Sequence, residues 1–524
     1  MRWLWCAVLV LGFAAPARGE WLEARNDHFV VYGDLPRAKM QQFAERLERF
    51  DSALRKVINL PALPGAPGDR VTIYVVRDQD EVVKLYSGRD STIAGFYVGR
   101  VQGPIAITPR ETDAGNQYFD AELVLFHEYT HHAILSSSAG YYPSWVGEGL
   151  AELFAVVRFE PNGDVVLGAP NNARAYSIMT DFPMSVSDLI ATDTRKLSPQ
   201  ATTQKYARGW LLTHYLLLGG KRPGQFNEFL NKVNEGMPAI DAAKVAFGDL
   251  GQLNRELNRY REGTLRAVLI KPDKLKPLPV TLRALDAGEA AMMPLRIRST
   301  VGVNREQAKA LIAPARAIAA RYPDNRWVQR VLAEMEYDAG NLAEADAACD
   351  RVLATESKNV DALVYKGRVE AGRASTAKGQ AARDHWLAAR RWYVKANRAA
   401  PTYALPFVLF YSSFKAIGET PSANAIKGLE EAVALVPQAD GPRLMLAMER
   451  LNAGDLKAVR TTLAPVAANP HGGANNLAAK LIALIDSGAD VTAVRAAVPA
   501  ENGVSVLNAQ DVGVSAMRSS NWLP

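Results

Sequence analysis

The segment FHEYTHHAIL, residues 126–135, narrows the folds open to this chain more than any other stretch. His127 and His131 stand four residues apart in a largely apolar run, which predicts a helix that the small polar residues SSSAG then end. Positions i and i+4 share one helical face, so both imidazoles can reach one divalent ion. Glu128 follows the first histidine and can contact a metal-bound water without ligating the ion. The fold must therefore bring a third metal-ligating side chain close to this face of the helix.

A second helix can supply that ligand. The stretch YYPSWVGEGLAELFA, residues 141–155, predicts a helix after Pro143, with Ser144 available as its cap. Glu148 and Glu152 lie one turn apart on a mostly apolar segment, where two carboxylates are costly to bury without a cation. One can complete a site of two histidines and one glutamate, and the other can accept the ring N–H of a ligand histidine. The alternative is a pair of solvated glutamates on a helix surface.

HExxH followed by Glu-Gly-Leu-Ala-Glu resembles the gluzincin metallopeptidases, the group of thermolysin and the alanyl-type zinc aminopeptidases. The resemblance implies one Zn²⁺ bound by His127, His131 and Glu148. It also implies Glu128 as the general base and Glu152 as the carboxylate that orients a ligand histidine. The segment WVGEGLAE is especially close to the Trp-Leu-Asn-Glu-Gly stretch of the aminopeptidases.

A second match lies in KYARGWLLTHYLLLGG, residues 205–220, which resembles the aminopeptidase helix whose leading tyrosine stabilises the transition state. The resemblance gives that role to Tyr206; the alternative is a core tyrosine on a Leu-rich helix. His214, two turns further on, could approach the site or simply pack. His132 points about 100° away from His131 and is expected to be a bystander.

One departure from the family concerns the edge strand that binds the substrate's free amine. Aminopeptidases have Gly-x-Met-Glu-Asn there, whereas the corresponding stretch here, VQGPIAIT at 101–108, contains no acid. Exopeptidase specificity is therefore not implied. Residues 104–108 could still pair with an extended peptide by strand addition.

The N-terminal half alternates strand and helix patterns. Short β-branched and aromatic runs predict strands at 28–33, 70–76, 94–99 and 104–108. Apolar residues spaced by three and four predict an amphipathic helix at 36–57. With the helices that follow, this predicts an α+β zincin-like domain over residues 20–265, a small mixed sheet plus a helical subdomain.

Beyond this domain the chain becomes rich in Ala and Leu. Residues 337–354 and 451–468 echo each other around Ala-Gly-Asn/Asp-Leu turns, within helix–turn–helix units of about 34 residues, the length of a tetratricopeptide repeat. A Pro- and Lys-rich stretch suggests a connecting segment before them. We therefore predict a connecting segment at 266–303, all-α tetratricopeptide-like repeats at 304–490 and a tail at 491–524. Within the repeats, residues 374–385 are predicted as an insertion and 403–437 as a degenerate unit. The repeats either bind a protein or peptide or only stabilise the first domain.

Residues 1–19 have the basic start, apolar run and small residues of a secretory signal peptide. We expect export to the periplasm or the medium, with no transmembrane segment after cleavage. Only Cys349 remains in the mature chain, which excludes an internal disulfide. A net charge of +6 over 524 residues does not favour a nucleic-acid partner.

The sequence thus predicts an exported zinc metallopeptidase that is not an aminopeptidase, acts on a peptide or protein substrate and has a helical repeat domain for a possible protein partner. Two alternatives remain open. The chain could be a non-catalytic envelope scaffold that binds through its repeats, or a zinc hydrolase of another amide or ester bond.

Overall fold

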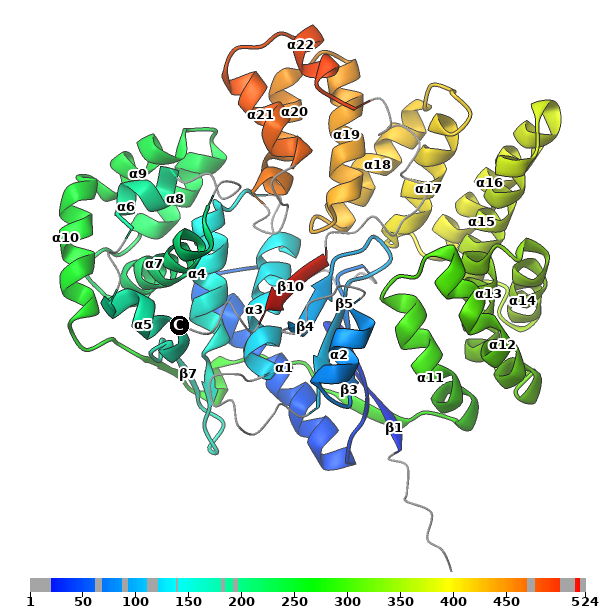
Figure 1. Ribbon diagram of the computed structural model, residues 1–524, viewed down its shortest axis with the longest axis horizontal. Helices are drawn as coiled ribbons and strands as arrows, with labels where there is room; N and C mark the ends of the chain where they lie inside the picture. Colours follow the sequence, from blue (N-terminus) through cyan, green and yellow to red (C-terminus); the bar gives the residue numbers. More distant parts are fainter. Residues whose placement is uncertain are drawn as a thin grey trace, which may run out of the picture.

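The structure is a computed structural model that describes residues 20–61, 68–86, 93–110, 121–137, 140–180, 184–191, 197–468, 476–499 and 514–518. It is mostly helical, with a mixed sheet in the N-terminal half and a long series of helices after it (Figure 1). The predicted signal peptide, residues 1–19, lies outside the described residues. Within them, every helix is too short or too polar to cross a bilayer.

The main sheet has seven strands in the order β10-β4-β5-β3-β2-β1-β9. The strands are β1 Trp21–Arg25, β2 Phe29–Asp34, β3 Val71–Val76, β4 Ile93–Val98, β5 Ile105–Pro109, β9 Thr281–Ala284 and β10 Val514–Arg518. The pairs β2–β3 and β3–β5 are parallel and the other pairs are antiparallel, so the sheet is mixed. The four predicted strands are present within one residue of their expected bounds at each end.

The predicted amphipathic helix is α1, Arg37–Ile58, and its apolar side chains are buried against the sheet. Residues Met40, Leu47 and Phe50 pack there with Val31 and Ile73 from the strands β2 and β3. A short helix, α2 Gln79–Leu85, follows β3.

The prediction that residues 104–108 offer a free edge for a peptide is wrong. Strand β5, which contains them, lies between β4 and β3 and is paired on both sides. The strand next to the outer edge is β4, and its outer side is paired with β10 from the C-terminal tail.

A helical subdomain follows the sheet, with a three-stranded sheet β6-β7-β8 beside it. Its helices are α3 Ala121–Ser136, α4 Ser144–Ala155, α5 Asn172–Thr180, α6 Val186–Ala191, α7 Pro199–Leu218, α8 Gln225–Asn234, α9 Ala239–Phe247 and α10 Leu250–Arg261, and its strands are β6 Arg158–Phe159, β7 Val165–Leu167 and β8 Val268–Ile270. Helix α3 packs over β4 and β5, while α4 packs between α3 and α7. These two helices carry both motifs found in the sequence.

The segment 266–303, expected only to connect two domains, is part of the first one. Its strand β8 completes the small sheet, and β9 pairs with β1 at one edge of the large sheet. A 3-10 turn, Pro272–Lys274, and the helix α11, Ala287–Thr300, complete the segment.

The C-terminal half is an array of helices in which each packs against the next, and they follow an arc in Figure 1. The bounds are α12 Arg305–Arg321, α13 Arg326–Ala339, α14 Leu342–Thr355, α15 Val360–Thr376, α16 Gly379–Ala399, α17 Ala404–Lys415, α18 Ala423–Leu435, α19 Asp440–Asn452, α20 Leu456–Ala467, α21 Leu477–Asp486 and α22 Val491–Ala496. The echoed turns have the same local conformation, since Gly340 and Gly454 both have a φ near +80°. A left-handed residue at this point ends one helix and lets the next fold back.

The structure adds detail to two expectations about this half. Residues 374–385, predicted as an insertion, end α15 and begin α16, so they lie in these two long helices and the turn between them. The tail from 491 includes α22, which packs on α21, and β10, which joins the large sheet.

Candidate metal centre

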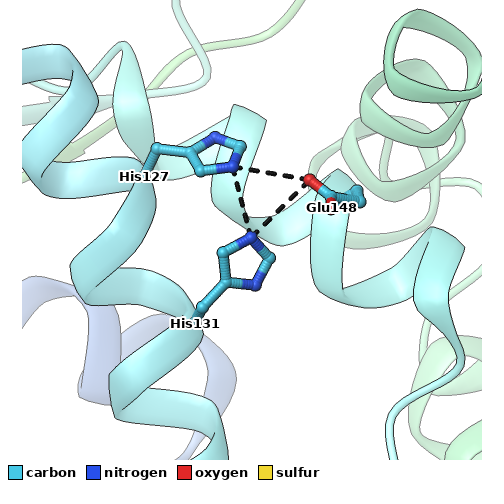
Figure 2. A group of neighbouring side chains, drawn as sticks. All are labelled: His127, His131 and Glu148. Carbon is cyan, nitrogen blue, oxygen red and sulfur yellow. Dashed lines mark hydrogen bonds and ion pairs between the residues drawn. The ribbon is translucent and has the colours of Figure 1, made fainter. Parts of the chain in front are cut away.

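His127, His131 and Glu148 come together between α3 and α4 (Figure 2). The Nε2 atoms of the two histidines are 3.2 Å apart. Glu148 Oε2 lies 3.4 Å from Nε2 of His127 and 3.6 Å from Nε2 of His131. All three side chains are buried, and the two helices thus direct three donor atoms at one point.

The spacing of these atoms fits a small tetrahedral ion. Donors that bind Zn²⁺ at about 2.0–2.1 Å in tetrahedral geometry are separated from one another by about 3.3–3.4 Å. The three observed separations, 3.2, 3.4 and 3.6 Å, bracket that value. Two nitrogens and one carboxylate oxygen are also donors that zinc prefers, although other transition metals accept the same set.

The electrostatics of the cluster keep the Glu148 carboxylate charged. Burial alone raises the pKa of Glu148, but the adjacent His131 and His127 outweigh it and hold the pKa well below its ordinary value. Burial lowers the pKa of His131, while Glu148 and the other nearby carboxylates more than offset this and raise it. The charged forms of Glu148 and His131 therefore favour each other.

Two glycines let α4 approach α7 closely. A Cβ added to Gly149 would lie 2.6 Å from the carbonyl oxygen of Gly209 and 2.3 Å from Oγ1 of Thr213. A Cβ added to Gly209 would lie 3.1 Å from the carbonyl oxygen of Trp145. The Gly after Glu148 in the motif is thus needed for packing, and this contact fixes the helix that holds the ligand.

Glu152 lies behind the cluster, with Oε1 3.6 Å from Nδ1 of His127. It is the carboxylate that the sequence assigned to orienting a ligand histidine. Its oxygens accept hydrogen bonds from Arg174 Nε and Nη2 at 3.0 and 2.7 Å and from Asn171 Nδ2 at 2.8 Å. Arg174 and Asn171 could not be found from the sequence, because a single Arg or Asn in NNARAY has no spacing that marks it as part of a site.

Tyr206, at 9% exposure, donates a hydrogen bond from its hydroxyl to Oε1 of Glu148 at 3.2 Å. Burial, with Glu148 nearby, raises the pKa of this phenol well above its ordinary value, so it remains a hydrogen-bond donor. The neighbouring Lys205, which no sequence motif marks, donates to Oγ of Ser144 at 2.5 Å. Burial lowers the pKa of Lys205 to about 8, although Glu148 opposes the shift.

Glu128 is buried on α3. Burial, the largest effect, lowers the pKa of His131, whereas Glu148 and, to a smaller extent, the negative charge of Glu128 raise it. Its charge also adds to the effect of burial in raising the pKa of Tyr97 on β4. Glu128 therefore lies near both the histidines and the strand β4.

The two other histidines considered in the sequence, His132 and His214, are engaged elsewhere. His132 contacts Tyr97 Oη through Nδ1 at 2.9 Å and the carbonyl oxygen of Asp69 through Nε2 at 3.1 Å. His214 donates from Nε2 to the carbonyl oxygen of Gly168 at 3.1 Å, because a carbonyl oxygen can only accept, and its Nδ1 contacts Tyr260 Oη at 2.8 Å. Neither histidine contributes an atom to the metal cluster.

Residues 124–239 match a family described as "Protein of unknown function (DUF1570)", a range that contains every residue of the cluster described above. A crystal structure of a thermophilic TPR protein from Thermus thermophilus aligns with 35% of this chain and 92% of that one, at 16% identity and a TM-score of 0.30. No curated protein matches the chain significantly.

Proposed function

We propose that this protein is a zinc-dependent hydrolase of peptide bonds, as its resemblance to gluzincins implies. The observation that carries the proposal is the triangle of His127 Nε2, His131 Nε2 and Glu148 Oε2, with sides of 3.2–3.6 Å. These three residues would hold the ion. When bound, zinc supplies Lewis acidity that polarises the scissile carbonyl and lowers the pKa of the attacking water.

Glu128 acts as the general base in this proposal. Its carboxylate accepts a proton from the attacking water as the water oxygen bonds to the carbonyl carbon, and it then gives that proton to the leaving nitrogen as the C–N bond breaks. The position of Glu128, next to His127 on α3 and near β4, supports this role, because the carboxylate lies beside the ligands without being one of them.

Tyr206 stabilises the developing negative charge on the carbonyl oxygen. Its neutral hydroxyl is directed at Glu148, one of the three proposed ligands, and is therefore within reach of a carbonyl bound there. A donor in a buried site of this kind lowers the transition-state energy by about 3–4 kcal/mol. Lys205 adds positive charge beside the same ligand.

The deciding experiment uses Glu128→Gln in the mature protein and a library of peptides. We expect wild type to bind one zinc and cleave peptides, and Glu128→Gln to keep the zinc but lose cleavage by at least about 100-fold. The exposed Glu228→Gln on α8 is the matched control and should behave as wild type. Cleavage at the wild-type rate by Glu128→Gln would refute the base assignment, whereas a silent wild type with bound zinc would favour another amide or ester bond.

The helical array and the predicted signal peptide complete the proposal. We place the protein outside the cytoplasm, with the array binding a substrate polypeptide or a partner protein. In that case long unfolded polypeptides should have a lower KM than short peptides of the same cleavage sequence. Equal KM values for both would leave the array with a purely structural role.

A further inference from the structure

We propose that Arg174 is a positioning residue that ties together two parts of the metal centre, the orientation of His127 and the place of Tyr206. This inference rests on the proposed function. It goes beyond the motif residues, because Arg174 lies on α5, outside the two helices that carry the ligands.

The first contact of Arg174 is with Glu152. Two guanidinium nitrogens bond both oxygens of this carboxylate, and the side chains are almost fully buried, at 1% and 0% exposure. A bidentate pair fixes the plane of the carboxylate as well as its position. Since Glu152 Oε1 lies 3.6 Å from Nδ1 of His127, Arg174 also limits how the His127 ring can rotate.

The second contact of Arg174 is with Tyr206. The guanidinium carbon lies 5.1 Å from the centre of the tyrosine ring, within the range of a cation–π interaction. The hydroxyl of the same ring bonds Glu148. One side chain is therefore linked to two of the three proposed ligands, through Glu152 on one side and through Tyr206 on the other.

The position of α5 is itself fixed by α7. Gly168, with a φ of +86°, makes the turn between β7 and α5, and its carbonyl oxygen is bonded by His214. Gln204 on α7 donates to the carbonyl oxygen of Ser177 on α5. His214, which the sequence offered as a possible catalytic group, instead holds the turn that leads to Arg174.

The geometry makes arginine hard to replace. A lysine at this position keeps the charge but presents a single ammonium group, which cannot bond both oxygens of Glu152 in one plane and stack on the ring of Tyr206 at the same time. With Arg174→Met, Glu152 loses two of its hydrogen bonds and can rotate away from His127. We therefore expect looser metal binding and a misplaced Tyr206.

The test compares Arg174→Met and Arg174→Lys with wild type and with Arg222→Met. Arg222 is the matched control. Its Nε makes an ion pair with Oε2 of Glu256 at a distance of 2.8 Å, and this pair is not part of the cluster. Three readouts are measured: the zinc dissociation constant by chelator competition, the visible absorption spectrum of the cobalt-substituted protein, and kcat and KM on a cleaved peptide.

For Arg174→Met we expect the zinc dissociation constant to rise by about 10–100-fold, with a changed cobalt spectrum, and kcat to fall more than KM rises. Arg174→Lys should be intermediate and Arg222→Met should match wild type. The double variant Arg174→Met/Glu152→Gln should weaken zinc binding little more than either single change, because both act through the same contact.

The outcomes separate this inference from the proposed function. Unchanged zinc affinity and cobalt spectrum in Arg174→Met, with only reduced thermal stability, would show a merely structural residue and overturn the inference alone. A wild type that binds zinc but cleaves no peptide overturns the proposed function, while the affinity and the spectrum still decide the role of Arg174. A wild type that binds no metal overturns both.

Discussion

The glycine that follows Glu148 offers a quantitative test of how the metal centre is built. Gly149 faces α7, and a Cβ there would lie 2.6 and 2.9 Å from the carbonyl oxygen and carbon of Gly209. Thr213, at 2.3 Å, can rotate away, but the backbone of Gly209 cannot. An ordinary contact of about 3.4 Å then requires α4 to move by roughly 0.5–0.8 Å, because the interior is close-packed.

The magnitude follows from two opposing effects. Gly→Ala inside a helix gains about 1 kcal/mol of helix propensity. Forcing an extra carbon into a packed interface costs about 1–3 kcal/mol, and a clash with backbone belongs at the upper end. Gly149→Ala should therefore lose about 1–2 kcal/mol of stability. Metal sites tolerate errors of only about 0.2 Å in ligand position, so zinc affinity should fall at least about tenfold.

Gly147→Ala is the matched control on the other side of Glu148. Its added Cβ would meet nothing closer than Nδ1 of His131 at 3.8 Å, an ordinary contact. This variant should keep its zinc and gain up to about 1 kcal/mol. Thermal unfolding with and without zinc, together with chelator competition, measures both effects. If Gly149→Ala is as stable as Gly147→Ala and binds zinc as tightly, the close contact of α4 with α7 does not set the ligand position.

Four further predictions use other parts of the structure. Tyr206→Phe should lower kcat by about 10²–10³-fold with unchanged zinc content, as peptide kinetics and metal analysis will check. We expect wild type to retain stoichiometric zinc through dialysis and Glu148→Ala to lose it. Burial lowers the pKa of His132 to about 3. The free energy of unfolding is therefore highest above pH 6.5 and falls by about 1.4 kcal/mol per pH unit below it, and His132→Gln should flatten this slope in denaturant titrations. Burial, with Glu334 nearby, raises the pKa of Asp338 to about 7. The free energy of unfolding therefore falls as the pH rises from 3.8 to 7, and at pH 8 Asp338→Asn should be more stable than wild type by up to about 4 kcal/mol.

The cluster of His127, His131 and Glu148 could be predicted because its signal is local. His127 and His131 are spaced to share one face of α3, and Glu148 follows on the next helix, so the three side chains meet once the two helices pack together. The strands β2, β3, β4 and β5 and the helix α1 were also readable, since each has its own apolar period.

The parts that sequence could not give depend on long-range pairing. Strand β9 lies next to β1, some 260 residues earlier, and β10 pairs with β4 from the far end of the chain. Neither short strand has a periodic pattern that would place it. Arg174 was missed for the same reason, because its partner Glu152 is identified by folding and not by a fixed spacing.

The protonation of His131 gives the proposed metal centre a pH dependence. Burial lowers the pKa of this imidazole, but Glu148 and the other carboxylates raise it above its ordinary 6.5, so below that raised value a proton occupies the ligand. A metal must displace this proton, because a ligand histidine must be neutral. Zinc affinity should therefore be constant at high pH and fall about tenfold per pH unit once His131 is protonated. Chelator competition from pH 5 to 9, with the chelator's own protonation accounted for, measures the slope. An affinity independent of pH below 6.5 would contradict the placement of His131 beside Glu148 as a ligand.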